Sequence, residues 1–106
     1  MLRSVPNSKE AEQAVLSAMF LSKNAQDVAF EMLDESAFYY DNNRKIYLAL
    51  KSLYDGNIPI DMTTITNELK NKGYLEEIGG VIYLTEVLNT ESTAANINYY
   101  LKIVQD

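Results

Sequence analysis

Residues 11–21 read AEQAVLSAMFL, a nearly continuous apolar run of helix-forming residues. Asn7 or Ser8 can cap the helix that this run predicts, with Glu10 three residues after Asn7 as in a capping box. The apolar side chains between Val15 and Leu21 cover more than one face of such a helix. A helix that is apolar around most of its circumference is buried on most sides. We therefore expect this segment to lie at the centre of the fold.

Five further segments have the apolar spacing of short helices. They run from a cap at Asn24 to about Leu33, from Asp41 or Asn42 to Tyr54, from Asp61 to Gly73, from Val81 to Leu88, and from a cap at Ser92 or Thr93 to Val104. The segment after Gly79 and Gly80 is rich in strand-forming residues, but its apolar positions fit helical spacing better than alternation. No strand–turn–strand pattern and no internal repeat is found. The sequence thus predicts an all-α fold, a compact orthogonal bundle of about six short helices.

One face of the last predicted helix carries the apolar side chains of Ile97, Tyr100, Ile103 and Val104. The two residues that follow, Gln105 and Asp106, provide no glycine, proline or basic residue to end the helix. We interpret this as a chain cut inside or just after a helix, and therefore as a piece of a longer protein.

The composition excludes several classes of function. The 106 residues hold 15 Asp and Glu against 9 Lys and Arg, a net charge of -6, so we expect no direct binding to DNA phosphates. The chain has no Cys and no His, which removes disulfides, thiolate nucleophiles, the usual zinc ligands and the commonest general base. No signal-peptide core and no apolar run of membrane-spanning length occurs, which predicts a cytoplasmic protein with no membrane contact.

Catalytic motifs are absent or weak. A phosphate-binding loop needs clustered glycines followed by lysine, and none of the four glycines has that spacing. Pairs of carboxylates occur at Glu10 and Glu12, at Asp34 and Glu35, and at Glu76 and Glu77. The first pair falls in the first turns of a helix, where the dipole favours negative charge, and the other pairs flank turns. We therefore expect no catalytic role for any of the three pairs, and we predict no catalytic, cofactor-binding or metal-binding residue.

Eight tyrosines, against three phenylalanines and no tryptophan, are more informative. Tyrosine is favoured at protein interfaces because its ring buries area while its hydroxyl stays hydrated. Tyr39–Tyr40 and Tyr99–Tyr100 are adjacent pairs, so the two rings of a pair cannot point to one face of a helix. If one ring packs inward, its neighbour faces solvent or a partner. For any single tyrosine, a half-buried position at the edge of the core remains the simpler interpretation.

Charge is distributed unevenly along the chain. Residues 1–53 hold 7 acids and 6 bases, a net of -1, whereas residues 54–106 hold 8 acids and 3 bases, a net of -5. Between Tyr74 and Leu101 there are four glutamates and no lysine or arginine. Such a segment is most often a solvated face. If it meets a partner, that partner should be basic.

Five motifs follow one another at natural spacing. They are Pro6-x-Ser8-x-Glu10-Ala11-Glu12-x-x-Val15-Leu16, Phe38-Tyr39, Pro59-Ile60-Asp61-x-x-Thr64, Leu75-Glu76-Glu77-Ile78-Gly79-Gly80-x-x-Tyr83-Leu84 and Ala94-Ala95-Asn96-Ile97-x-x-Tyr100-x-x-Ile103-Val104. Together they resemble the N-terminal domain of the DnaB family of bacterial replicative helicases, over almost the whole chain. Two departures are visible: Asn43 stands where the family usually has histidine, and Ser17 stands where a glycine is common.

The resemblance implies a parent chain that continues into a RecA-like ATPase domain and unwinds duplex DNA as a ring hexamer. ATP and Mg²⁺ would bind in that domain and not in these residues. It also implies that the N-terminal domains form a collar, a trimer of dimers, through a helical hairpin that would start near Ser92. The expected organisation is then a globular helical head over residues 1–91, followed by the truncated start of a hairpin or linker helix over residues 92–106. The collar docks primase, and a helicase loader is a further candidate partner. By its place in the Gly-Gly-x-x-Tyr motif, Tyr83 is the first candidate for primase contact, with Tyr99 and Tyr100 as weaker candidates for protein contact.

Three functions stay open on the sequence alone. The first is a non-catalytic oligomerisation and partner-docking domain of a replicative helicase. The second is a free-standing helical adaptor or helicase-loader-like protein with the same head fold. A Gly-x-x-x-x-Gly-Lys-Ser/Thr loop in the sequence following residue 106 would favour the helicase. The third is a small enzyme that uses paired carboxylates, which the absence of His and Cys disfavours.

Overall fold

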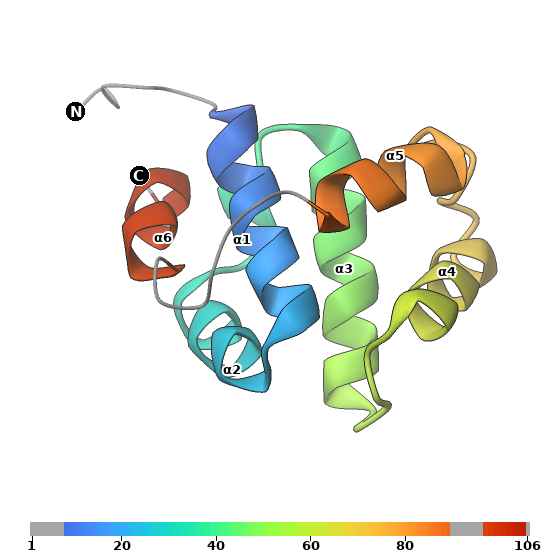
Figure 1. Cartoon of the computed structure of the whole chain (residues 1–106), viewed down its shortest axis with the longest axis horizontal. Helices are drawn as coiled ribbons and strands as arrows, with labels where there is room; N and C mark the ends of the chain where they lie inside the picture. Colours follow the sequence, from blue (N-terminus) through green and yellow to red (C-terminus); the bar gives the residue numbers. More distant parts are fainter. Residues whose placement is uncertain (1–7, 90–96, 106) are drawn as a thin grey trace.

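Six α-helices and one short 3₁₀-helix make up the part of the chain that the computed structural model describes, residues 8–89 and 97–105, and this part contains no strand (Figure 1). The helices are α1 (Lys9–Leu21), α2 (Lys23–Met32), η1 (Glu35–Ala37), α3 (Asp41–Asp55), α4 (Met62–Asn71), α5 (Gly80–Leu88) and α6 (Ile97–Gln105). The predicted all-α fold of about six short helices is confirmed.

Helix α1 lies at the centre of the molecule. Every residue from Ala11 to Met19 is buried except Gln13. Helices α2, α3, α5 and α6 all pack against α1, and Figure 1 shows α6 on one side of it and α3 and α5 on the other. A helix covered on so many sides needs apolar residues around most of its circumference. The expected central position of the apolar run at residues 11–21 is therefore confirmed.

Serine side chains begin the first two helices. The Ser8 hydroxyl oxygen accepts a hydrogen bond from the Ala11 N–H at 3.1 Å, and the Ser22 hydroxyl oxygen accepts one from the Ala25 N–H at 3.2 Å. The predicted cap at Asn24 is wrong, because Asn24 already lies inside α2. Ser22 has extended backbone angles, so this single residue both ends α1 and begins α2.

The signals predicted for α3 and α4 are found in the structure. Gly56 is the C-terminal cap of α3, as expected from its position. Asp61 caps α4 and forms a capping box with Thr64, in which each side chain accepts a hydrogen bond from the other residue's backbone N–H. Helix α3 begins after Tyr40 without a side-chain cap.

Two glycines in the left-handed region introduce α5. Gly79 has φ 107° and Gly80 has φ 73°, values that side-chain-bearing residues rarely adopt. A Cβ atom on Gly79 would also lie 3.0 Å from the Cβ atom of Tyr83. The preference for helix over strand after these glycines is confirmed. The turn sets where α5 begins, and therefore which of its residues face the core.

Helix α6 packs against α1 and α2. Its buried residues are Ile97, Leu101 and Val104, with Tyr100 and Ile103 partly buried beside them. The predicted apolar face is thus present, with Leu101 as an additional buried member. The predicted cap at Ser92 or Thr93 and the predicted boundary between residues 91 and 92 lie outside the described residues.

Candidate partner-binding site

Tyr83, the first candidate for partner contact, lies on α5 and is half-buried. Its hydroxyl donates a hydrogen bond to the Asn43 side-chain oxygen on α3 at 2.7 Å. The same hydroxyl accepts a longer hydrogen bond of 3.4 Å from the Gln13 side-chain amide on α1. The Lys9 ammonium lies 5.8 Å from the centre of the ring. The hydroxyl thus makes its hydrogen bonds inside the domain, and the partly buried side chain packs against the core.

Beneath Tyr83 lies a buried carboxylate, Glu12, of which only 1% is exposed. One of its oxygens accepts a hydrogen bond from the Tyr39 N–H at 2.8 Å. The other accepts from the Asn43 amide at 3.0 Å and from the Tyr40 N–H at 3.4 Å. Asn43, which is fully buried, therefore joins Glu12 to Tyr83. This network, Glu12–Asn43–Tyr83, connects α1, the segment before α3, α3 and α5.

Glu12 is buried, which its place in the first turns of a helix did not predict. Helix α1 is covered on the side where Glu12 points, and donors from the segment before α3 stabilise its charge. A signal was present in the sequence, because Val15 and Leu16, three and four residues later, share the face of Glu12 and are buried. Asn43, one of the two departures from the family pattern, is the residue whose side-chain amide donates a hydrogen bond to Glu12. The other departure, Ser17, is buried and donates to the Leu88 carbonyl oxygen at 3.1 Å.

The environment of Tyr83 keeps its hydroxyl protonated. Burial is the main cause that raises the pKa of Tyr83; the Gln13 hydrogen bond acts against it, and the nearby charges of Glu12 and Glu86 add to the increase. The protonated hydroxyl can therefore serve as a donor to Asn43 at neutral pH. Beside the ring is a shallow hollow of about 220 Å³, lined by Lys9, Tyr40, Asp41, Asn42 and Tyr83.

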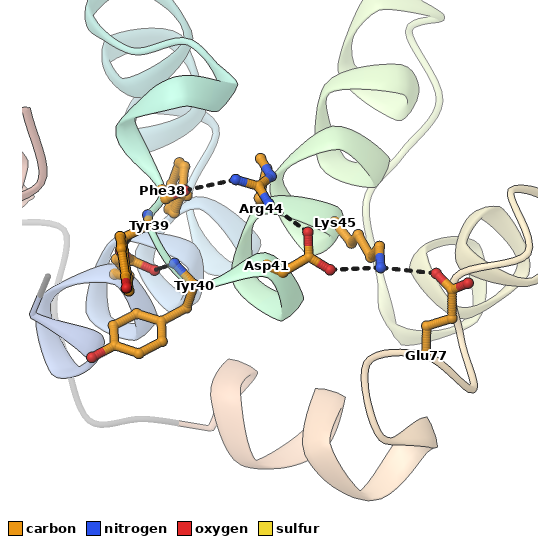
Figure 2. Close-up of polar contacts among 8 residues, drawn as sticks. Phe38, Tyr39, Tyr40, Asp41, Arg44, Lys45 and Glu77 are labelled. Carbon is orange, nitrogen blue, oxygen red and sulfur yellow. Dashed lines mark hydrogen bonds and ion pairs between the residues drawn. The ribbon is translucent and has the colours of Figure 1, made fainter.

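A chain of charges holds the start of α3 against the turn that precedes α5 (Figure 2). The Asp41 carboxylate accepts hydrogen bonds from Arg44 and Lys45, and the Lys45 ammonium also lies 2.8 Å from the Glu77 carboxylate. The hydrogen bond from Lys45, followed by that from Arg44, lowers the pKa of Asp41. The Arg44 guanidinium also donates to the Phe38 carbonyl oxygen at 3.4 Å. These pairs are partly exposed, so they orient the segment more than they stabilise the fold.

The two adjacent tyrosine pairs behave as expected. Tyr39 is 60% exposed and Tyr99 is 66% exposed, whereas their neighbours Tyr40 and Tyr100 are half-buried. In each pair the rings meet edge to face, with centroids 5.2 Å apart in the first and 5.3 Å apart in the second. The structure does not bring the candidates together into one site. Tyr83 is on α5 and the Tyr99–Tyr100 pair is on α6, and these helices lie on different sides of α1 (Figure 1).

The remaining carboxylate pairs are exposed. Asp34 caps η1, and Glu77 pairs with Lys45. Within residues 8–89 and 97–105, no group of three or more carboxylates is placed to hold a metal ion. In the same residues, no helix has the length and apolar character needed to cross a membrane.

A comparison with protein families gives a match to the DnaB-like helicase N terminal domain over residues 4–106. The chain belongs to this family. The DnaB-like domain is 48% identical over 104 residues to the replicative DNA helicase DnaC of Bacillus subtilis, a match that covers 98% of this chain and 23% of the helicase. It is 45% identical over 104 residues to the replicative DNA helicase DnaB of Geobacillus stearothermophilus, with the same two coverages.

The fold has a counterpart among solved structures. The crystal structure of the N-terminal domain of DnaB helicase from Mycobacterium tuberculosis superimposes with a TM-score of 0.89 at 40% identity. The match covers 94% of this chain and 71% of that one. The DnaB-like domain described here therefore has the fold of its family, and it spans about a quarter of the length of the replicative helicases that it matches.

Proposed function

We propose that this DnaB-like domain serves a replicative helicase as a non-catalytic domain that joins subunits in the ring and docks primase in the cytoplasm. The relatives that support this are named as replicative DNA helicases, and the domain corresponds to 23% of their length. Its 106 residues contain no phosphate-binding loop of the Gly-x-x-x-x-Gly-Lys type. Nucleotide hydrolysis and unwinding would then belong to another part of the parent protein.

The observation that carries the proposal is the contrast between a well-packed interior and the large apolar side chains that stay exposed on α1, α2, α5 and α6. Within the described residues no buried side-chain nitrogen or oxygen lacks a hydrogen-bond partner. Yet Ile82 on α5 is 78% exposed and Tyr99 on α6 is 66% exposed. Apolar side chains that gather on a soluble domain's surface mark sites of protein contact. Helices α5 and α6 would then serve two different partners, primase and a neighbouring subunit.

Tyr83 is the first residue to test for primase contact. We expect Tyr83→Ala to weaken the affinity for primase about tenfold, since truncation of an interface tyrosine commonly costs about 1 to 2 kcal/mol. Tyr83→Phe removes only the hydroxyl that donates to Asn43. It should lower the melting temperature by several degrees and leave the affinity within about twofold of wild type.

The measurement is isothermal titration calorimetry of this chain with the helicase-binding domain of the Bacillus subtilis primase, because the helicase of that organism is 48% identical. A thermal melt of each variant separates binding from stability. If Tyr83→Ala destabilises the domain and leaves the affinity unchanged, Tyr83 is a residue of the core edge. If the wild-type chain does not bind the primase domain at all, the docking function is wrong.

A further inference from the structure

Small side chains hold helix α2 to the core. Its buried residues are Ala25, Gln26 and Ala29, whereas each of the other five described α-helices buries at least one leucine or isoleucine. The larger apolar residues of α2, Val28 and Phe30, are only partly buried. Because the stabilisation from apolar burial grows with the area removed from water, two alanines contribute little. A region with so little buried apolar area tends to open before the rest of a fold.

Two tyrosine hydroxyls of α3 reach the two ends of α2. Tyr54 donates a hydrogen bond to the Asp27 carboxylate in the first half of α2 at 2.5 Å. Tyr47 donates one to the carbonyl oxygen of Leu33, the residue that ends α2, at 3.0 Å. The two contacts differ in environment, because Tyr47 is 1% exposed whereas Tyr54 is partly buried and Asp27 is exposed. The contact of Tyr54 therefore competes with water, and that of Tyr47 does not.

Further side chains surround the exposed contact. The Lys23 ammonium lies 3.4 Å from the Asp27 carboxylate and 5.2 Å from the centre of the Tyr54 ring. The Phe30 and Tyr54 ring centres are 4.6 Å apart, and the Lys51 ammonium lies 5.5 Å from the centre of the Phe30 ring. We call these five residues the Tyr54 cluster. All five are exposed or partly buried, so each contact stabilises the closed position of α2 only slightly.

We infer that α2 opens as a local unit while the rest of the domain stays folded, and that the Tyr54 cluster determines how often it opens. The unit comprises residues 23–32. Ser22 is its boundary on one side, since this residue ends α1 and begins α2. Leu33 is its boundary on the other side, because Leu33 is buried and its carbonyl oxygen is held by Tyr47.

The opening of α2 changes two neighbouring surfaces. Lys23 and Gln26 form part of the wall of a hollow of about 370 Å³, which Leu21 and Ile58 also line. This hollow loses that wall when α2 opens. Helix α6 packs against α2 as well as against α1, so it loses one of its two supports at the same time. The Tyr54 cluster thereby controls both the width of the hollow and the support of α6.

The test is native-state amide hydrogen exchange, measured by NMR on the wild-type chain and on Tyr54→Phe and Tyr47→Phe. Each variant loses one hydroxyl that α3 donates toward α2, and the two positions are seven residues apart on the same helix. The amides of residues 26–32 report the opening of α2. The slowest amides of α1 and α3 report global unfolding. A thermal melt of each variant confirms that it is folded.

We expect the α2 amides of the wild type to exchange at least about tenfold faster than the slowest amides of α1 and α3. Tyr54→Phe should speed both sets about fivefold, because its hydrogen bond is broken in the open state and in the unfolded state alike. Tyr47→Phe should speed the slowest amides of α1 and α3 and leave those of α2 unchanged, because its hydrogen bond to Leu33 persists when α2 opens.

Three results would overturn the inference. The first is exchange of the wild-type α2 amides at the rate of the slowest amides of α1 and α3, which would make the domain a single unit. The second is unchanged exchange of α2 in Tyr54→Phe, and the third is an equal acceleration of α2 and of the slowest amides in Tyr47→Phe. Tyr54→Phe keeps the ring that contacts Phe30, so the first two results decide the question even if Tyr47→Phe does not fold.

Discussion

At the scale of single residues, the buried carboxylate of Glu12 joins α1 to the segment before α3 and to α3 itself. A carboxylate removed from water is unfavourable unless hydrogen-bond donors replace its hydration. Here the donors are the N–H groups of Tyr39 and Tyr40 and the amide of Asn43. Because these donors belong to the segment before α3 and to α3 itself, Glu12 is satisfied only when that segment is folded against α1. The position of Tyr83 follows, since Asn43 is shared between them.

Glu12→Gln should therefore destabilise the domain, because the amide presents one acceptor oxygen where the carboxylate presents two. We expect a loss of about 2 kcal/mol, the typical contribution of hydrogen bonds to a charged group, and a fall in melting temperature of about 10 °C. Glu10→Gln is the matched control, since Glu10 lies two residues away and is exposed; it should change the stability by less than about 0.5 kcal/mol. Equal melting temperatures for the two variants would contradict the role assigned to Glu12.

At the scale of elements, the sequence was sufficient to place most of the helices. Apolar spacing predicted each of them, and Gly56 and Asp61 marked the end of α3 and the start of α4 correctly. The start of α2 was missed because serine and asparagine are both favourable N-caps. The choice between Ser22 and Asn24 depends on where α1 ends. The exposed side of α5, which carries Val81 and Ile82, was missed for a related reason. In a run of apolar residues, spacing alone does not reveal which side stays uncovered, because this depends on how α5 crosses α1.

The turn before α5 allows a prediction about this element as a unit. Gly79→Ala should destabilise the domain by more than about 1 to 2 kcal/mol, because alanine is disfavoured at φ 107° and its Cβ atom would press on Tyr83. Gly73→Ala is the control, since Gly73 also has positive φ, 76°, but no atom lies within 4 Å of the added Cβ. Chemical denaturation of both variants measures the difference. We expect only Gly79→Ala to weaken primase binding as well, since only Gly79 contacts Tyr83. Equal effects of the two changes on stability and on binding would show that the contact with Tyr83 is unimportant.

At the scale of the whole molecule, α5 and α6 lie on different sides of the central helix α1. Helix α1 carries α6 on one side and α3 and α5 on the other (Figure 1). A net charge of -6 opposes contact with DNA phosphates, and an acidic rim beside α5 favours a basic protein. We therefore propose that the domain presents α5 to primase and leaves α6 for another contact.

The most direct test of this account is an NMR titration of the ¹⁵N-labelled chain with the Bacillus subtilis primase domain, followed by a titration with single-stranded DNA at physiological salt. We expect the primase domain to shift the amide signals of α5, above all those of Val81, Ile82 and Glu86, and to leave those of the α1–α2 junction near Ser22 unchanged. Single-stranded DNA should shift none of them. Shifts caused by DNA, or an absence of shifts on α5 with the primase domain, would contradict the central claim that this domain docks a protein partner through α5.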